Sequence, residues 1–269
     1  VTMTQPIQIR KGKFTTQNSF TVGGSATGWS SKTPLPYGAD IKDVAVSTLS
    51  ILSATNATPI VITTATNHNL ATGAVGDVVY ISGLTTNTNG NGKHYAKYIT
   101  DTTFSLYAEA GLSTAIAGNG VTSTGVVEYV WLCTTDSRIH CSFDGGDAWV
   151  NQDTDEPYSV NAIQLITPSI GYAVGASGTV MKAIAAYDRV GSTDVWDTMA
   201  TPGGDAVSTF YCLSFYSSTG GWIAGANGKV YLTTDGSTWT AKTTATLTGK
   251  TILGIYGVDA SNARLCTSL

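Results

Sequence analysis

Charged side chains are scarce in this sequence. Asp, Glu, Lys and Arg make up 12% of its 269 residues, about half the usual ~25%, and the formal net charge is -4. A protein that binds nucleic acid through its phosphates needs a positive surface, so we expect no nucleic-acid partner. The one small basic cluster, Arg10, Lys11 and Lys13, is interpreted as a solvated N-terminal arm.

Long apolar runs and paired cysteines are missing too. No run of about 18 apolar residues occurs, and the first residues lack the apolar core of a signal peptide, so we expect no membrane partner. No CxxC pair is formed by Cys133, Cys141, Cys212 and Cys266, which argues against zinc. Cys133 and Cys141 share a predicted hairpin but do not lie opposite each other, so free thiols are expected.

Thr, Ser, Gly and Asn are abundant instead. Thr is β-branched and favours strands, whereas Gly and Asn supply turns. The hydrophobic fraction of 42% is enough to build packed cores. The composition therefore predicts an all-β protein.

The order of strand-like and turn-like segments divides the chain into three parts. Residues 1–45 are expected to form an N-terminal arm or assembly strands, with one strand over residues 40–46. Residues 46–127 carry short strand-like runs at roughly 10–15-residue spacing, which predicts a small β-barrel or sandwich. Residues 128–269 contain internal repeats.

The middle part contains an ordered series of short motifs. They are Pro59–Thr64, His68-x-Leu70-x-Thr72-Gly73, Gly76-Asp77-x-Val79-x-Ile81-x-Gly83, Asn91-Gly92 and Thr102-Thr103-Phe104-x-Leu106. The series resembles a small β-module of bacteriophage tail and virion proteins that is often labelled after the FCCH domain of the ubiquitin-activating enzyme. The resemblance implies a binding or spacer role. The inserted Ala74-Val75 departs from the usual pattern, and His68 is expected to hydrogen-bond local backbone.

The last part is built from repeats, the strongest pattern in the sequence. Residues 131–146 align without a gap with residues 222–237 and have similar residue types at the sixteen positions. A middle copy covers residues 171–181. The closing tryptophans are 47 and 43 residues apart, at Trp149, Trp196 and Trp239, which is the size of a four-stranded propeller blade. Residues 181–187 favour a helix by propensity, but the repeat register predicts a strand and then a loop.

Two repeats end in a polar turn of the form Ser/Thr-x-Asp-x-Gly-x-x-Trp or one residue shorter. The Asp is expected to accept backbone N–H groups of its own turn, the Gly to take a positive φ, and the Trp to cover the hairpin from a largely buried position. The residues are Ser142, Asp144, Gly146, Trp149, Thr233, Asp235 and Trp239. They resemble the Asp-box repeats of sialidases and the related repeats of photosystem II assembly factors.

This resemblance implies β-propeller-type blades. A further copy begins at Thr251, giving about three and a half blades, fewer than the four to eight of a closed propeller. Three alternatives follow. The N-terminal region supplies missing strands, the ring is open, or another chain completes it.

No catalytic constellation accompanies the repeats. Sialidases use three clustered arginines, whereas no shared strand context links Arg10, Arg138, Arg189 and Arg264. The acidic residues fall mostly in turns, and the segment that begins at Asn151 imitates a calcium loop but has Glu156 and Ala162 where Gly and Glu are needed. We therefore expect no enzyme activity, no cofactor and no metal site.

These features together lead to the hypothesis of a bacteriophage structural protein, located in the virion as a head decoration, fibre or tail component. Its expected partners are other virion proteins and its own protomers in a homo-oligomer. The alternative is an extracellular glycan- or receptor-binding module that recognises a host surface glycan. Its candidate sugar-stacking aromatics are Trp29, Trp131, Trp222 and Tyr256, although Trp131 and Trp222 are more simply interpreted as blade core.

Overall fold

The computed structural model describes residues 40–152, 157–183 and 195–268, which form an all-β protein. Eighteen strands and four short 3₁₀ turns make up its regular structure in these ranges. The predicted fold class is therefore confirmed. The 3₁₀ turns are Thr88–Gly90, Pro202–Gly204, Ala226–Gly228 and Ala245–Leu247.

The middle part of the chain is a closed, antiparallel six-stranded barrel. Each strand pairs with the next in the order β1 (Ile41–Ala54), β2 (Val61–Thr64), β5 (Thr103–Tyr107), β4 (Gly92–Thr100), β3 (Asp77–Ser82) and β6 (Val126–Thr134). A second pairing, between β6 and β1, closes the circle. Closure leaves no sheet edge in the barrel without a partner.

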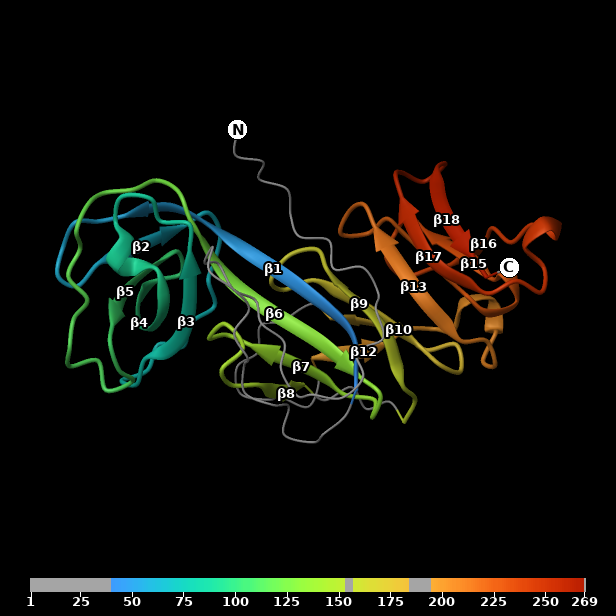
Figure 1. The fold of residues 1–269 in the computed structure, drawn as a ribbon, viewed down its shortest axis with the longest axis horizontal. Helices are drawn as coiled ribbons and strands as arrows, with labels where there is room; N and C mark the ends of the chain where they lie inside the picture. Colours follow the sequence, from blue (N-terminus) through green and yellow to red (C-terminus); the bar gives the residue numbers. More distant parts are fainter. Residues whose placement is uncertain (1–39, 153–156, 184–194, 269) are drawn as a thin grey trace.

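The same two strands, β1 and β6, continue from the barrel into the first blade. The first half of β1 pairs with the second half of β6, and β6 pairs further with β7 (Ile139–Ser142), which pairs with β8 (Val150–Gln152). Blade 1 is this four-stranded sheet. The barrel is thus inserted between the first two strands of blade 1 (Figure 1). The expected boundaries at 45/46 and 127/128 fall inside β1 and β6, because each strand serves both units.

Two more four-stranded sheets and one two-stranded sheet follow. Blade 2 consists of β9 (Val160–Leu165), β10 (Gly171–Gly175), β11 (Val180–Ala183) and β12 (Trp196–Thr198). Blade 3 consists of β13 (Phe210–Phe215), β14 (Gly221–Gly225), β15 (Val230–Thr233) and β16 (Thr240–Ala241). The terminal hairpin consists of β17 (Ile252–Gly257) and β18 (Ala263–Thr267).

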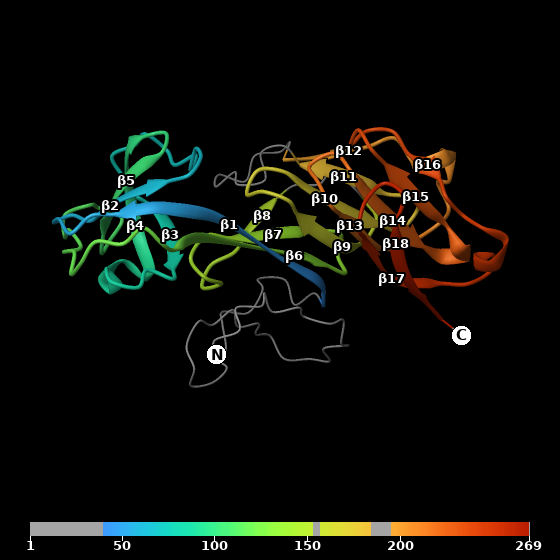
Figure 2. The same ribbon diagram turned by 90° about the horizontal axis from the view of Figure 1, so that it is seen from above.

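The blades follow one another away from the barrel, as the two ribbon views show (Figures 1 and 2). Their first strands pack in the order β1, β9, β13 and β17. Residues 41–45 supply the first strand of blade 1, so one of the three alternatives, an N-terminal contribution to the blades, is confirmed for this strand. The rest of the expected N-terminal arm, residues 1–39, lies outside the described residues.

One apolar core runs from the barrel through blades 1 and 2. It includes Ile62 and Phe104 in the barrel and Trp131 and Trp196 in the blades. The indole N–H groups of Trp131 and Trp196 both donate to Oε1 of Gln152, at 3.2 and 2.9 Å. Separate clusters join blade 2 to blade 3 and blade 3 to the terminal hairpin. Barrel and first blades therefore share their packing as well as two strands.

Ile62→Ala is expected to loosen blade 1 as well as the barrel. Ile62 is fully buried in β2, and such a truncation costs about 2–5 kcal/mol. Because β1 and β6 belong to both units, we expect faster hydrogen exchange in β7 together with the barrel strands. Hydrogen exchange detected by mass spectrometry measures the exchange rate of each strand. Val207→Ala is the control, because Val207 is 89% exposed. Unchanged exchange in β7 would show that the two units open independently.

Candidate functional site

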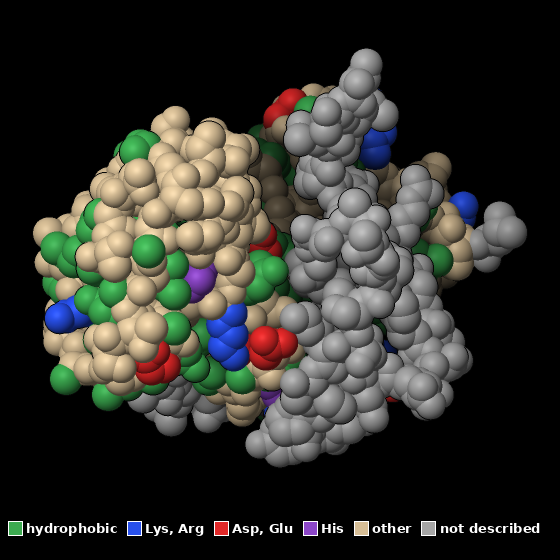
Figure 3. All heavy atoms as spheres, turned by 60° about the vertical axis from the view of Figure 1, so that its left-hand side comes forward, with side chains coloured by type: hydrophobic (Ala, Val, Ile, Leu, Met, Phe, Trp, Pro, Cys, Tyr) green, Lys and Arg blue, Asp and Glu red, His purple; other side chains and the backbone are tan. Residues whose placement is uncertain are grey.

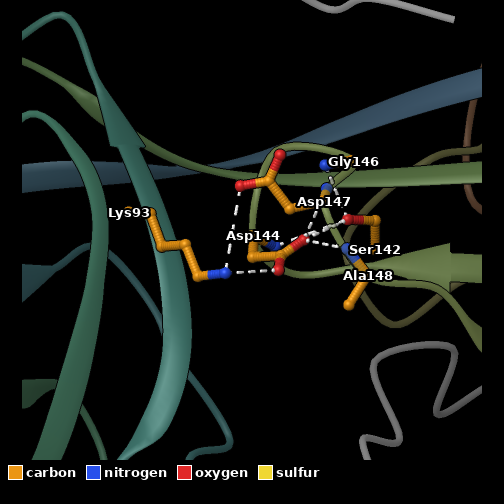
Figure 4. Close-up of polar contacts among 6 residues, drawn as sticks. All are labelled: Lys93, Ser142, Asp144, Gly146, Asp147 and Ala148. Carbon is orange, nitrogen blue, oxygen red and sulfur yellow. Dashed lines mark hydrogen bonds and ion pairs between the residues drawn. The ribbon is translucent and has the colours of Figure 1, made fainter. Parts of the chain in front are cut away.

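The first Asp-box turn connects β7 to β8, and groups within this turn donate hydrogen bonds to its carboxylate, that of Asp144. Oδ1 of Asp144 accepts the backbone N–H groups of Asp147 and Ala148, at 3.0 and 2.9 Å. It also accepts the hydroxyl of Ser142, at 2.9 Å, and the N–H of Gly146 donates to that hydroxyl, at 2.8 Å (Figure 4). The backbone contacts predicted for Asp144 are therefore confirmed.

The second turn connects β15 to β16 and repeats this pattern. Oδ1 of Asp235 accepts the N–H groups of Ser237 and Thr238, at 2.8 and 2.7 Å, and the hydroxyl of Thr233, at 3.1 Å. Its Oδ2 accepts the hydroxyl of Thr238, at 2.6 Å. The hydrogen bonds from the hydroxyl and backbone N–H of Thr238 lower the pKa of Asp235 well below its usual range. The predicted backbone contacts of this carboxylate are confirmed as well.

The tryptophans that close the two Asp-box turns are less buried than predicted. Trp149 and Trp239 directly precede β8 and β16, the last strands of their blades, and both are half-buried. Trp196, which starts the last strand of blade 2, is 3% exposed because its ring is part of the core, whereas Trp239 only packs against the edge of a core cluster and Trp149 belongs to none. The ring of Trp239 meets Phe215 edge to face, with centroids 6.2 Å apart.

The two Asp-box turns differ in what lies against them. Asp144 is 2% exposed, because the barrel covers it, whereas Asp235 is exposed. From β4 of the barrel, Lys93 places Nζ 2.9 Å from Oδ2 of Asp144 and 3.9 Å from Oδ2 of Asp147 (Figure 4). An ion pair thus joins the barrel to the turn of blade 1.

The pKa values of both partners shift as this pairing requires. Burial raises the pKa of Asp144, but hydrogen bonds from the N–H of Ala148, Lys93 and the Ser142 hydroxyl outweigh it and lower the pKa overall. The hydrogen bond to Asp144 raises the pKa of Lys93. Both groups are therefore charged across the neutral range.

Each turn also places a glycine against a tyrosine of the neighbouring unit. A Cβ on Gly145 would lie 2.6 Å from the ring of Tyr80 in the barrel, and one on Gly236 would lie 2.5 Å from the hydroxyl of Tyr172 in blade 2. Both glycines have positive φ, at 78° and 69°. A larger residue is thus excluded by strain and by space.

The tyrosine of each pair lies opposite a lysine on the adjacent strand. Tyr80 faces Lys93, and Tyr172 faces Lys182, whose Nζ donates to the carbonyl of Gly236 at 3.3 Å. The barrel therefore presents to blade 1 the same Tyr–Lys pair that blade 2 presents to blade 3. The sequence contained no signal for this repetition, because it depends on which strands are neighbours.

The other candidate residues have structural roles. Nε2 of His68 donates to the carbonyl of Thr100, at 2.7 Å, while its Nδ1 accepts the N–H of Leu70, at 3.1 Å, which confirms the backbone role predicted for it. In the described ranges, no three His, Cys, Asp or Glu side chains gather as a metal site would require, and no helix is long and apolar enough to cross a membrane. Asp153, Asp155 and Glu156 of the calcium-like segment lie outside these ranges.

The aromatic platform suggested for sugar binding does not form as a group. Trp131 is fully buried and Trp222 is 6% exposed, which confirms their interpretation as blade core. Tyr256 is exposed on β17, and Trp29 lies outside the described residues. Cys133 and Cys141 form no disulfide, and they face Ile139 and Trp131 rather than each other.

The sequence matches no protein-family model, and no curated protein matches it significantly. Among solved structures, YCF48 bound to D1 peptide is 12% identical over 90% of this chain and 80% of that chain, with a TM-score of 0.42. YCF48 from Cyanidioschyzon merolae is 13% identical over 78% and 72%, at 0.42. A chain of the COPII outer coat vertex is 8% identical over 85% and 58%, at 0.43. Such distant similarities carry no inference about function, and the fold class stands on the strand topology.

Asp144→Ala is expected to destabilise the protein more than Asp235→Ala. The first change leaves the N–H groups of Asp147 and Ala148 without their carboxylate acceptor and removes the 2.9 Å partner of Lys93, at a cost of about 1–3 kcal/mol. Asp235→Ala is the matched control, because water can replace the exposed carboxylate. Urea unfolding of both variants measures the difference. Equal losses would contradict the role given to the barrel contact.

Acid is expected to destabilise the wild type partly through Asp144. Its pKa is lowered in the folded state, so its contribution is complete above the unfolded pKa of about 3.9 and is lost as the pH falls through the folded value. The free energy of unfolding of Asp144→Asn should therefore fall less between about pH 5 and pH 2. A variant with the slope of the wild type would show that this carboxylate is not coupled to folding.

Proposed function

We propose that this chain is a non-enzymatic structural protein of a bacteriophage particle. In this proposal it is a head decoration, fibre or tail component that works through contacts with other particle proteins and with its own copies. The motif series of residues 59–106 supports the bacteriophage assignment through its resemblance to tail modules. The inserted barrel supports a spacer role, because two continuous strands hold it to blade 1.

The observation that carries the proposal is the apolar surface of the terminal hairpin. Four of the eleven large apolar side chains that are exposed in the described residues belong to this short unit, namely Leu253, Tyr256, Val258 and Leu265. Their exposed fractions lie between 40% and 63%. A short unit with this many exposed apolar residues is typical of a protein–protein contact site.

The weak charge of the surface also favours assembly. In Figure 3, which views the barrel end, charged side chains are few and scattered among neutral ones. Surfaces of this kind oppose the approach of other copies only weakly, because little like charge has to be brought together.

Among the described residues, the Asp-box carboxylates are occupied and the two arginines lie on different units. Asp144 and Asp235 are saturated by hydrogen bonds within their own turns. Arg138 pairs with Asp136 in the β6–β7 turn, while Arg264 lies on β18. These positions support a protein without catalysis, since carboxylate-binding sites need converging arginines.

The glycan- or receptor-binding alternative ranks second. Among the described residues, only Tyr256 of its candidate aromatics is exposed. A stacking platform usually needs more than one free ring face, so this alternative has less support.

The proposal predicts that the chain is a stoichiometric component of purified particles. Quantitative mass spectrometry of gradient-purified particles and of the particle-free lysate would test this. We expect enrichment in the particle fraction, and no hydrolysis of sialosides or polysaccharides by the purified chain. Absence from particles, or reproducible turnover of a glycan, would overturn the proposal.

A further inference from the structure

Blades 2 and 3 and the terminal hairpin each have one pair of facing residues at the same position of their first two strands. The pairs are Gln164 and Tyr172, Ser214 and Trp222, and Tyr256 and Arg264. Each lies one residue before the last pairing of its hairpin, which joins Leu165 to Gly171, Phe215 to Gly221 and Gly257 to Ala263. The three pairs are therefore structural equivalents.

In blade 2, this pair binds the main chain of the next hairpin. The side chain of Gln164 donates to the carbonyl of Phe215, at 3.0 Å, and accepts its N–H, at 2.8 Å. Tyr172 donates its hydroxyl to the carbonyl of Ser218 in the following turn, at 2.9 Å. Burial raises the pKa of Tyr172 to about 12, so this donor keeps its proton.

In blade 3, the equivalent pair does the same. The hydroxyl of Ser214 accepts the N–H of Gly257, at 2.9 Å. The indole of Trp222 donates to the carbonyl of Asp259 in the turn of the terminal hairpin, at 2.8 Å. Both pairs thus hold the end of a strand and the turn after it, and both do so through main-chain atoms.

In the terminal hairpin, the equivalent pair is open. Tyr256 is 63% exposed and Arg264 is exposed, and neither side chain hydrogen-bonds to a residue that the structure describes. Leu253 on the same strand is 50% exposed. Its equivalent in blade 2, Asn161, donates to the carbonyl of Phe210 in the next blade, at 2.9 Å. The exposed face formed by Leu253, Tyr256 and Arg264 is therefore equivalent to the faces that join one blade to the next.

We propose that Tyr256 and Arg264 bind the main chain of a β-hairpin supplied by a different protein. Among the described residues, the hairpins that fit such a site are already held. β9–β10 lies on blade 1, where Asp43 accepts the N–H of Ile163 at 3.1 Å. β13–β14 is held by blade 2, and β17–β18 by blade 3. A second copy would have the same hairpins engaged, so these hairpins do not supply the occupant in either copy.

The arginine specifies an acidic turn in that hairpin. The equivalent donors, Tyr172 and Trp222, are neutral, whereas Arg264 carries a charge and several N–H donors. A carboxylate beside the turn carbonyl would make a charge-assisted hydrogen bond, which is stronger than a neutral one. The turn that Trp222 binds already has this chemistry, because it contains Asp259.

This inference deepens the proposed function and rests on it. A cyclised peptide of residues 252–267 is a suitable probe, because the equivalent sites address main-chain atoms and its turn contains Asp259. Cyclisation is needed because an isolated two-stranded hairpin is barely stable in water. NMR titration of the labelled full chain detects binding even in the millimolar range.

We expect saturable shifts at Tyr256 and Arg264. Tyr256→Ala and Arg264→Ala should each weaken binding about tenfold, whereas Arg138→Ala, a change in an exposed turn of blade 1, should leave it unchanged. An Asp259→Asn peptide should bind more weakly to the wild type but not to Arg264→Ala. Both chain residues are exposed, so the variants should keep the wild-type spectrum elsewhere.

Several results would overturn the inference. They are no shifts at millimolar peptide, shifts at the indole of Trp222 instead, binding that survives both substitutions, and self-association of the chain through this face. The particle assay distinguishes the two proposals. If the chain is present in particles but does not bind the hairpin, the proposed function stands and the binding site is wrong. If the chain binds the hairpin but is absent from particles, the binding site stands and the proposed function is wrong.

Discussion

The pairing of β1 with β6 is the interaction on which the rest of the structure depends. These strands are two sides of the barrel at one end and the first two strands of blade 1 at the other. A one-residue slip would turn every side chain of a strand to the opposite face, so the register of the barrel fixes that of the blade. The barrel is held by paired strands rather than by a flexible linker.

Contacts to main-chain atoms and glycines then connect the units in series. Gly145 and Gly236 admit a tyrosine of the neighbouring unit because they lack a Cβ. The side chains of Gln164 and Ser214 bind backbone groups of the next strand. Such contacts depend little on the side chains of the partner, which explains how repeats as different as blades 2 and 3 pack in one way. The same contacts leave an open position at the terminal hairpin.

Features that depend on local spacing were predictable from the sequence. The Asp-box hydrogen bonds close within a few residues, and the blade register correctly made residues 181–183 a strand against their helical propensity. The loop expected after them, residues 184–187, lies outside the described residues. The pairing of residues 41–45 with β6 was not predictable, because the whole barrel separates the two segments in the sequence. Trp149 and Trp239 are less buried than expected, and the Tyr–Lys contacts were missed, because both depend on the order of strands in space. The bacteriophage assignment is still a proposal.

The most direct test of the central claim is an NMR measurement of cross-strand contacts and amide exchange along β1 and β6. The shared-strand arrangement predicts an unbroken ladder from Asp43 opposite Cys133 to Ser50 opposite Val126, with slow exchange throughout. A gap in the ladder near Val46 and Val130, with the two halves exchanging at different rates, would contradict it. That result would make the barrel a separate domain on a hinge.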